Sequence, residues 1–240
     1  MEFIRADRLH KRFRGVQAVT DVSFGAGEQE VLGIIGPNGA GKTTVFNLIA
    51  GTFRSDSGTL TFDGRDVTGL PSYRRLRCGI ARTFQLIRPF GSLTARDNLI
   101  VSATGSGMAL RQARARADEV LGVFGLAEVA TRPAGSLNAA EGKRLEVARA
   151  VAARPRVILL DEVFTGLVGQ EVAELAGLVA GLRDAGMTIL VIEHSVTAIR
   201  MIADRVVAMD AGRVICVGDP GSVFSDVNVV ESYLGHHTAA

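Results

Sequence analysis

Glycines, a lysine and threonines between residues 36 and 44 carry the clearest chemistry in this sequence. The stretch reads Gly36-Pro37-Asn38-Gly39-Ala40-Gly41-Lys42-Thr43-Thr44 and satisfies the pattern GxxxxGK[ST]. Phosphate oxygens need several donors at close range, and backbone N–H groups supply them where glycines keep side chains away. Lys42 can then reach the outer phosphates, and the Thr43 hydroxyl can ligate Mg²⁺. The residue types predict a site for a nucleoside triphosphate and its magnesium ion.

Two carboxylates follow an apolar run further along the chain, in Val157-Ile158-Leu159-Leu160-Asp161-Glu162. In a parallel sheet the carboxyl ends of the strands face the ligand crevice, so both groups should lie beside the phosphates. Asp161 is then a candidate to hold Mg²⁺, and Glu162 to polarise the attacking water. Many surface strands end in acids, so the run gains its meaning from the phosphate loop. Together the two elements predict hydrolysis of the bound nucleotide.

Two more polar residues stand where predicted strands end. His194 closes the apolar run 188–192, from where it could contact the γ-phosphate, although a lone histidine at a strand end is more often structural or solvated. Gln85 follows the strand-like stretch 80–84 and precedes a helical region. At this junction the glutamine could sense the γ-phosphate and move the helices that follow.

The scaffold for these residues is expected to alternate between strands and helices. The first thirty residues favour short antiparallel strands, and 31–35 favours a buried strand before the glycine loop. From about residue 88 to 140 strand signals vanish and Ala, Arg and Leu dominate, which predicts an inserted helical subdomain whose start carries a possible capping box, Thr94 and Asp97. Beyond it we expect helices at 144–154, 172–184, 196–203 and 223–234 and strands at 157–160, 188–192, 206–209 and 213–217.

This order of elements predicts an α/β fold, namely a P-loop NTPase with a mostly parallel sheet core. An N-terminal antiparallel β subdomain and the helical subdomain, at about 88–140, complete it. The 240 residues are long enough to bury a sizeable core, and we expect one domain spanning 1–240.

Composition excludes several classes of protein. A net charge of +2, from 27 basic and 25 acidic residues, gives no electrostatic case for nucleic acid. Arg74, Arg75 and Arg77 have helical spacing, for which a solvated face is the better interpretation. Cys78 and Cys216 lack the spacing of a disulfide framework or zinc site, which favours a reducing compartment. No signal-peptide core or run of 18 apolar residues is present, so another chain would have to hold this one at a membrane.

With these elements in order, the chain resembles the ATP-binding cassette family nearly end to end. The resemblance implies ATP and Mg²⁺ as cofactors, an adenine stacked on Phe13, and a switch role for His194. Carried onto this sequence, the nucleotide-binding residues are Phe13, Gly36, Pro37, Asn38, Gly39, Ala40, Gly41, Lys42, Thr43 and Thr44, the metal ligands are Thr43, Gln85 and Asp161, and the catalytic residues are Glu162, His194, Lys42 and Gln85.

Three stretches are similar to a narrower group, the ATPase subunits of branched-chain amino acid importers. They are Val45-Phe46-Asn47, Ala81-Arg82-Thr83-Phe84-Gln85 and the ending Val230-Glu231-Ser232-Tyr233-Leu234-Gly235. The similarity implies transmembrane permease subunits, a second ATPase subunit and, indirectly, a solute-binding protein as partners, at the cytoplasmic face of a membrane, with no nucleic acid. The alternatives are a non-transport ATPase, a subunit that binds ATP mainly for regulation, and a cassette for lipid or lipopolysaccharide export.

One family element is altered in this chain. Where the family has the signature Leu-Ser-Gly-Gly-Gln, the sequence reads Leu137-Asn138-Ala139-Ala140-Glu141, which loses a hydroxyl and a close-approach glycine and adds a negative charge. Val163 and Val168 likewise replace the usual proline and Asp or Asn. In the family these elements serve the nucleotide of the opposite subunit, so the pattern predicts an asymmetric heterodimer with one poor site. The alternative is that Asn138 and the start of the following helix still serve.

Overall fold

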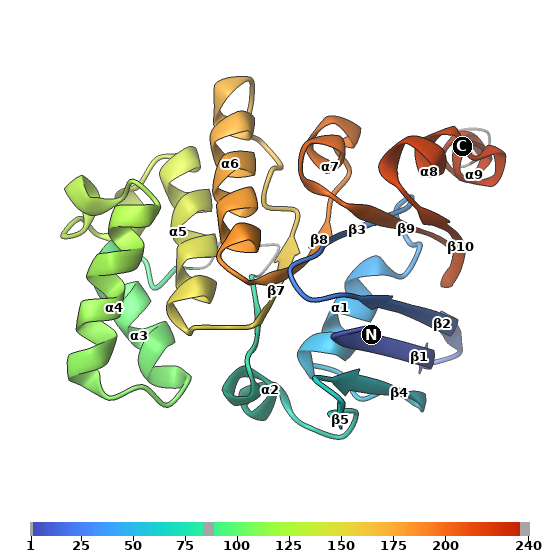
Figure 1. The fold of residues 1–240 in the computed structure, drawn as a ribbon, viewed down its shortest axis with the longest axis horizontal. Coiled ribbons are helices and arrows are strands. Elements are labelled where there is room, and N and C mark those ends of the chain that lie inside the picture. Colours follow the sequence, from blue (N-terminus) through green and yellow to red (C-terminus); the bar gives the residue numbers. More distant parts are fainter. Residues whose placement is uncertain (1, 84–88, 236–240) are drawn as a thin grey trace.

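Two sheets and a set of covering helices make up the described part of the chain, residues 2–83 and 89–235 of the computed structural model. Gln85 and His236 lie outside this range. The first sheet is antiparallel, with strand order β2-β1-β4-β5. Its strands are β1 Ile4–Phe13, β2 Val16–Ala26, β4 Ser57–Phe62 and β5 Arg65–Asp66. It lies at the edge of the molecule away from α3 and α4 (Figure 1).

The second sheet carries the candidate site, in the order β10-β9-β3-β8-β7-β6. Its strands are β3 Val31–Ile35, β6 Ile80–Arg82, β7 Val157–Asp161, β8 Thr188–Ile192, β9 Arg205–Asp210 and β10 Arg213–Gly218. All its pairings are parallel except that of β9 with β10. Strands β3, β7 and β8 are buried along their whole length, as expected for a parallel sheet covered on both faces. The predicted fold class is confirmed.

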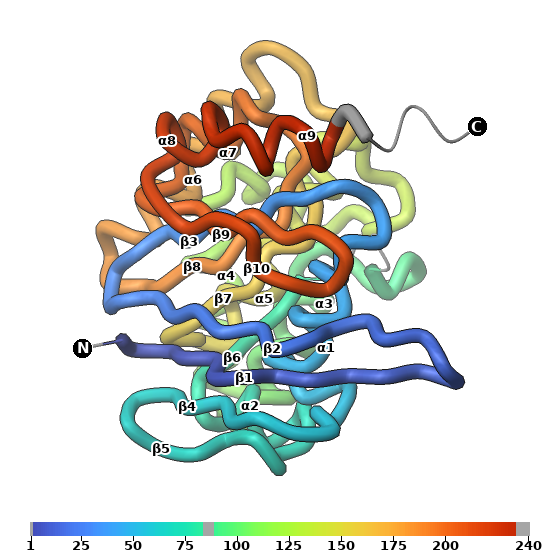
Figure 2. Tube along the Cα trace, turned by 90° about the vertical axis from the view of Figure 1, so that its right-hand side faces the viewer, coloured from blue at the N-terminus to red at the C-terminus, as the bar shows by residue number. Residues whose placement is uncertain are grey.

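Helices cover this sheet on both faces. They are α1 Lys42–Ala50, α2 Ser72–Cys78, α3 Ala95–Gly105, α4 Leu110–Val123, α5 Ala139–Ala152, α6 Gln170–Asp184, α7 Val196–Ile202, α8 Pro220–Ser225 and α9 Val227–Gly235. The buried residues of α1 share one apolar core with the antiparallel sheet, whereas α3 to α7 pack into a second core on the other face. Figure 2 shows α7, α8 and α9 together at the top of the molecule. The β1–β2 hairpin runs from left to right below them.

The last predicted helix, 223–234, is wrong as a single element, because the chain leaves the helical region at Asp226. The backbone of Asp226 is extended, and its carboxylate accepts hydrogen bonds from the N–H groups of Asn228 and Val229 at 2.9 and 3.3 Å. It ends α8 and caps α9, as short acceptors do at helix starts. The fifth helix also differs, since α5 begins at Ala139 rather than at residue 144.

Two interpretations of polar residues also need correction. Thr94 caps α3 by accepting from the N–H of Asp97, but the Asp97 carboxylate accepts the Thr94 hydroxyl and does not return to its backbone. Arg75 does not belong to a solvated face, being only 2% exposed. Its guanidinium donates to the carbonyls of Ile49, Thr68 and Leu70. It thereby satisfies acceptors at the C-terminus of α1 that no helical N–H can reach.

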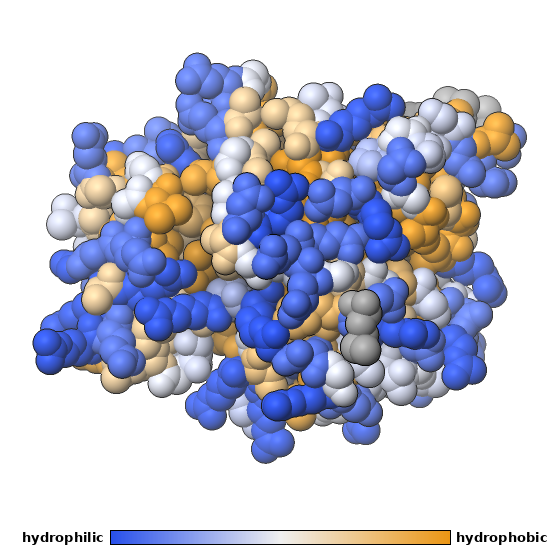
Figure 3. All heavy atoms as spheres, viewed as in Figure 1, coloured by the Kyte–Doolittle hydropathy of each residue, from blue (hydrophilic) through white to orange (hydrophobic). Residues whose placement is uncertain are grey.

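Hydrophilic residues cover much of the face seen in Figure 3, with apolar ones between them. Within residues 2–83 and 89–235, no helix is both long enough and apolar enough to cross a bilayer. Cys78 and Cys216 are both free thiols.

Candidate functional site

The glycine loop joins the end of β3 to the start of α1 in a conformation that only glycine accepts easily. Gly36, Gly39 and Gly41 have φ values of 150, 83 and 95°. A Cβ at Gly36 would lie 2.1 Å from the Met209 carbonyl oxygen, and one at Gly41 would lie 2.5 Å from that of Ala18. No side chain caps α1 at Gly41, so the first N–H groups of the helix remain available to an anion.

Lys42 lies folded back over this loop. Its Nζ donates to the carbonyl oxygens of Gly36 and Pro37 at 2.7 and 2.9 Å, and the residue is 6% exposed. Burial lowers the pKa of its ammonium group, while the nearby carboxylates of Glu162 and Asp161 act in the opposite direction. Carbonyl oxygens are weaker acceptors for a cation than phosphate oxygens. The lysine can therefore exchange them for a triphosphate.

The two carboxylates lie at the same edge, because β7 ends beside β8 with Asp161 opposite Ile192. Asp161 is buried, and its Oδ2 accepts from Arg82 at 2.7 Å. Burial raises the pKa of its carboxyl group, which Arg82 opposes. Its Oδ1 is buried without a hydrogen-bond partner among the described residues. A buried acceptor of this kind fits a group that brings a cation or a water, so Asp161 suits Mg²⁺ or its hydration shell.

Glu162 and His194 meet across the ends of β7 and β8. The distance from Glu162 Oε1 to His194 Nε2 is 2.9 Å. Glu162 has a φ of 53°, a left-handed conformation that is uncommon outside glycine and is often found at functional sites. Its backbone is fixed on both sides, since its N–H donates to Ile192 and Lys143 Nζ donates to its carbonyl at 3.1 Å. The backbone that bears the carboxylate is thus held at the sheet edge.

Glu162, His194 and most of the phosphate loop line one cleft of about 270 Å³, whose lining does not include Asp161. Glu162 and His194 form one wall, and the loop from Asn38 to Thr44 with part of β2 forms the other. The cleft unites the predicted phosphate loop with the predicted catalytic pair. Among the described residues no group of three His, Cys, Asp or Glu side chains could hold a metal ion. A magnesium ion here would rely on Thr43, Asp161, water and nucleotide oxygens, the sparse ligand set that Mg²⁺ usually takes.

The predicted adenine contact and the altered signature do not line this cleft. Phe13, at the end of β1, is 36% exposed and packs edge-on against Phe53 with ring centroids 5.2 Å apart. It does not line the cleft, so its role against adenine stays a prediction. Gln85 lies outside the described residues, and its role also stays a prediction. Residues 137–142 do not line the cleft either.

The altered signature folds into a structure that its letters specify but that the sequence analysis missed. Asn138 is the N-cap of α5, and its Oδ1 accepts from the Glu141 N–H at 2.8 Å. The Glu141 Oε2 accepts from the Asn138 N–H at 2.9 Å. This is a complete capping box, for which the spacing Asn-x-x-Glu was the available signal. Arg132 lies 3.6 Å from the same carboxylate.

A tyrosine in the last helix also contacts the loop, and nothing in the local pattern indicated it. The N–H of Gly36 donates to the Tyr233 hydroxyl oxygen at 2.8 Å. Burial raises the pKa of this hydroxyl group. Because it accepts from Gly36, Tyr233 anchors the point at which β3 becomes the phosphate loop.

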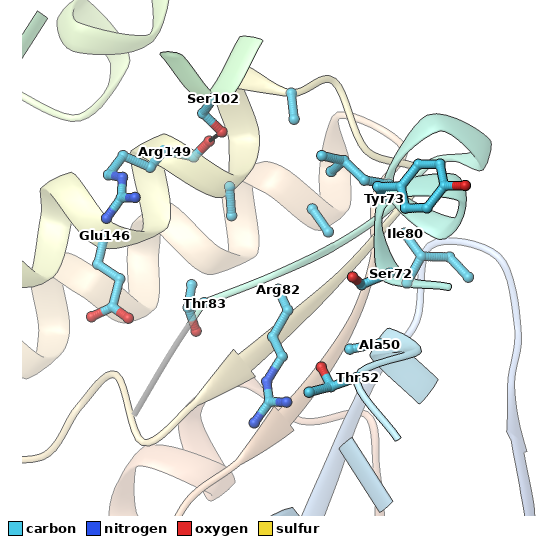
Figure 4. Close-up of a pocket in the computed structure, with 14 residues that line it drawn as sticks. Ala50, Thr52, Ser72, Tyr73, Ile80, Arg82, Thr83, Ser102, Glu146 and Arg149 are labelled. Atoms are coloured by element: carbon cyan, nitrogen blue, oxygen red, sulfur yellow. Dashed lines mark hydrogen bonds between the residues drawn. The ribbon is translucent and has the colours of Figure 1, made fainter. Parts of the chain in front are cut away.

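A separate groove of about 430 Å³ lies between the nucleotide-binding core and the helical subdomain. Figure 4 shows Arg82 and Thr52 on one side of it and Glu146 and Arg149 of α5 on the other, with Tyr73 at its rim. The groove adjoins Thr83, the last described residue before Gln85.

Comparison with known families gives one match over most of the chain. A family model described as "ABC transporter" matches residues 19–165, which include the phosphate loop, the altered signature and both carboxylates. Among solved structures, a nucleotide-free ATP-binding cassette from an ABC transporter superposes with a TM-score of 0.90 at 29% identity, covering 97% of this chain and 99% of its own. An ADP-bound conformation of such a cassette gives a TM-score of 0.89 at 29% identity, over 98% and 99%.

The curated relatives include ATPases named for two kinds of transport. The branched-chain amino acid transport ATP-binding protein LivG of Salmonella typhimurium is 39% identical over 95% of both chains. BraF of Pseudomonas aeruginosa, described in the same terms, is 36% identical over 95% of both. The lipopolysaccharide export ATP-binding protein LptB of Haemophilus influenzae is 34% identical over 98% of both.

Proposed function

The chain belongs to the ABC transporter family and is one of its ATPases, and from this premise we propose that it powers an importer for branched-chain amino acids or a related small solute. The observation that carries the proposal is the cleft in which Glu162 and His194, 2.9 Å apart, face the phosphate loop. That arrangement suits hydrolysis, and two of the relatives described above are named for branched-chain amino acid transport.

In this proposal the loop from Gly36 to Thr44 binds the triphosphate. Its glycines let backbone N–H groups approach the phosphates, the uncapped start of α1 adds further donors, and Lys42 moves from the loop carbonyls to phosphate oxygens. Mg²⁺ supplies charge neutralisation on the phosphates when bound, with Thr43 and Asp161 as the residues that hold it. Phe13 is assigned to the adenine and Gln85 to the metal and the γ-phosphate by family resemblance alone.

Glu162 acts on the attacking water. Its backbone is held by Ile192 and Lys143, so the carboxylate can orient the water and accept its proton while His194 holds the carboxylate and contacts the γ-phosphate. Such positioned acid–base groups contribute about 10²–10⁴-fold to rate. Either residue is close enough to the cleft to act without rearrangement of β7 or β8.

We further propose that the chain works in a dimer with a second ATPase subunit, and that the two nucleotide sites are unequal. Residues 137–142 lie away from the chain's own cleft, which supports their service to a partner. At the start of α5, Asn138 and Glu141 already satisfy each other's N–H groups, which leaves fewer donors for a partner's phosphate. A homodimer in which this start of α5 still serves is the alternative.

Transmembrane permease subunits are the further proposed partners, which hold this chain at the cytoplasmic face of the membrane. A solute-binding protein acts on it indirectly, through the permeases. The groove of about 430 Å³ between the core and the helical subdomain supports this assignment. The groove is lined by residues of α1, β6 and α5, so a permease segment seated there would contact the core and the helical subdomain at once. The net charge of only +2 supports a set of partners without nucleic acid.

Export of lipid or lipopolysaccharide is the second candidate, because LptB is nearly as similar as LivG. The test is reconstitution of the chain in vesicles with the permeases, second ATPase and solute-binding protein encoded beside it. Uptake of labelled leucine that requires ATP, and is lost with Glu162→Gln, is the expected result. Extraction of lipopolysaccharide from the same vesicles without leucine uptake would replace the importer with the exporter.

A further inference from the structure

Arg82 makes contacts that no step of the proposed hydrolysis uses. It is the last residue of β6, and its side chain is only 8% exposed. One guanidinium nitrogen, Nη2, donates to Asp161 Oδ2 at 2.7 Å, and the other, Nη1, donates to Asn47 Oδ1 at 2.7 Å. Two good bonds made by the two arms of one planar group fix its position, as a lysine could not.

Each of these contacts leads to a predicted magnesium ligand. Asp161 is one such ligand. Asn47 reaches the backbone of a second, Thr43, because its Nδ2 donates to the Thr43 carbonyl at 2.8 Å. Thr43 belongs to α1 and Asp161 to β7, so the two ligands sit on different elements. Arg82, from a third element, ties them together.

The pairing also sets which oxygen of Asp161 is available. Oδ2 accepts from Arg82, whereas Oδ1 is buried and has no hydrogen-bond partner in the part of the chain that the structure describes. A carboxylate held by one oxygen presents the other in a fixed direction. Groups that orient a ligand in this way typically change metal affinity about 10–100-fold when they are removed.

Arg82 also lines the groove of about 430 Å³ between the core and the helical subdomain (Figure 4). The next residue, Thr83, lines the same groove, and its hydroxyl oxygen accepts from the Asp161 N–H at 3.0 Å. The end of β6 therefore has one side in the groove and the other on the metal carboxylate. A segment that enters the groove and shifts β6 must also shift the partners of Asp161.

We propose that Arg82 is a positioning residue that holds Asp161 and α1 ready for MgATP and links occupancy of the groove to the metal site. A structural counter-ion for a buried carboxylate would explain the ion pair alone. It would not explain the second arm to Asn47 and Thr43. The inference rests on the proposed binding of MgATP.

The test measures binding of a fluorescent ATP analogue to the full-length chain at increasing Mg²⁺ concentration. With Arg82→Met, the Mg²⁺ concentration for half-maximal enhancement should rise about 10–100-fold. Affinity for the analogue in excess chelator should stay within about twofold of wild type, because the phosphate loop is intact. Asn47→Ala, which removes only one arm, should give a smaller rise. Arg77→Met, an exposed arginine on α2, is the matched control and should change nothing.

Thermal unfolding separates positioning from a structural role. Should Arg82→Met fail to fold, Arg82→Lys carries the test, since it keeps the charge but cannot bridge both partners. An unchanged Mg²⁺ requirement in a folded Arg82 variant, whatever its melting temperature, overturns the inference. If wild type itself shows no Mg²⁺-enhanced binding, the proposed function fails first, and the two failures are thereby distinguished.

A double-mutant cycle tests the link to the groove. Ser72 is an exposed residue of α2 that lines it, so Ser72→Trp should fill part of the groove. We expect Ser72→Trp to shift the Mg²⁺ half-saturation at least about threefold in the wild type and not in Arg82→Met, as for two coupled sites. Equal shifts in both backgrounds, or no shift in either, overturn the link.

Discussion

The starts of α1 and α5 are both helix N-termini near sites of proposed phosphate chemistry, yet they are built in opposite ways. Helix α1 begins at a glycine with no side-chain cap. Helix α5 begins with a complete capping box made by Asn138 and Glu141. The contrast teaches that the positive end of a helix is a ligand site only where the chain leaves its N–H groups unsatisfied. The chain has left one such end open and closed the other with its own side chains.

The sharpest test of the open end is Glu162→Gln in the reconstituted transporter. It removes the group that accepts the water's proton but leaves the amide able to contact His194, so ATP turnover should fall about 10²–10⁴-fold. Binding of the ATP analogue should be retained, because Gly36 to Thr44 are unchanged. Turnover within tenfold of wild type would remove Glu162 from the chemistry.

The sheet edge that carries Glu162 and His194 should also lower the stability of the fold as the pH rises, through Glu193. Glu193, which follows β8 and accepts from the Phe164 N–H at 2.8 Å, is 1% exposed. Burial raises the pKa of its carboxyl group to about 7 from 4.5. The folded chain keeps a proton that the unfolded chain loses in this interval. The contribution of Glu193 is therefore full below pH 4.5 and is lost as the pH rises to 7, by up to about 3 kcal/mol.

Denaturant unfolding at pH 5 and pH 8 checks this sign. Glu193→Gln should flatten the loss of unfolding free energy between the two values, whereas Glu231→Gln, an exposed carboxylate on α9, should leave it as in wild type. A Glu193→Gln slope equal to that of wild type contradicts the assignment.

Opening the closed end should raise activity. The combined change Asn138→Ser, Ala140→Gly and Glu141→Gln removes the carboxylate that fills the start of α5 and restores a close-approach glycine. Turnover of the assembled complex should rise at least about tenfold, since one transition-state donor is typically worth about 10²–10³. Glu231→Gln, an exposed residue of α9 outside both helix starts, is the control. No rise at all counts against unequal sites and favours the reading in which the start of α5 already serves.

The smallest effect isolates the cap itself. Asn138→Ala removes the side chain that accepts the Glu141 N–H, and the unfolding free energy of the isolated chain should drop by about 1 kcal/mol. The loss should be the same with and without the ATP analogue, because α5 does not line the cleft of its own chain. A loss that appears only with nucleotide bound would place this cap in the chain's own site.

Much of the candidate site could be predicted because it depends on local order. Asp161, Glu162 and His194 follow buried apolar runs, and parallel strands deliver such residues to one edge. The contacts of Arg82 and Tyr233 were not predicted because their partners are distant in sequence, and no pattern of period two or 3.6 encodes such contacts. Arg75 was misread for a related reason, since helical spacing fixes a common face but not which neighbour covers it. The spacing of Asn138 and Glu141 could have predicted a capping box. It was interpreted only as the loss of signature residues.

The hydrogen bond between Gly36 and Tyr233 joins residues 197 positions apart. During synthesis the phosphate loop therefore leaves the ribosome well before its tyrosine. A nascent or truncated chain that ends before α9 therefore has the whole glycine loop and lacks the contact that anchors its start. The order of translation thus places this contact of the nucleotide site after β10, the last strand of the main sheet among the described residues.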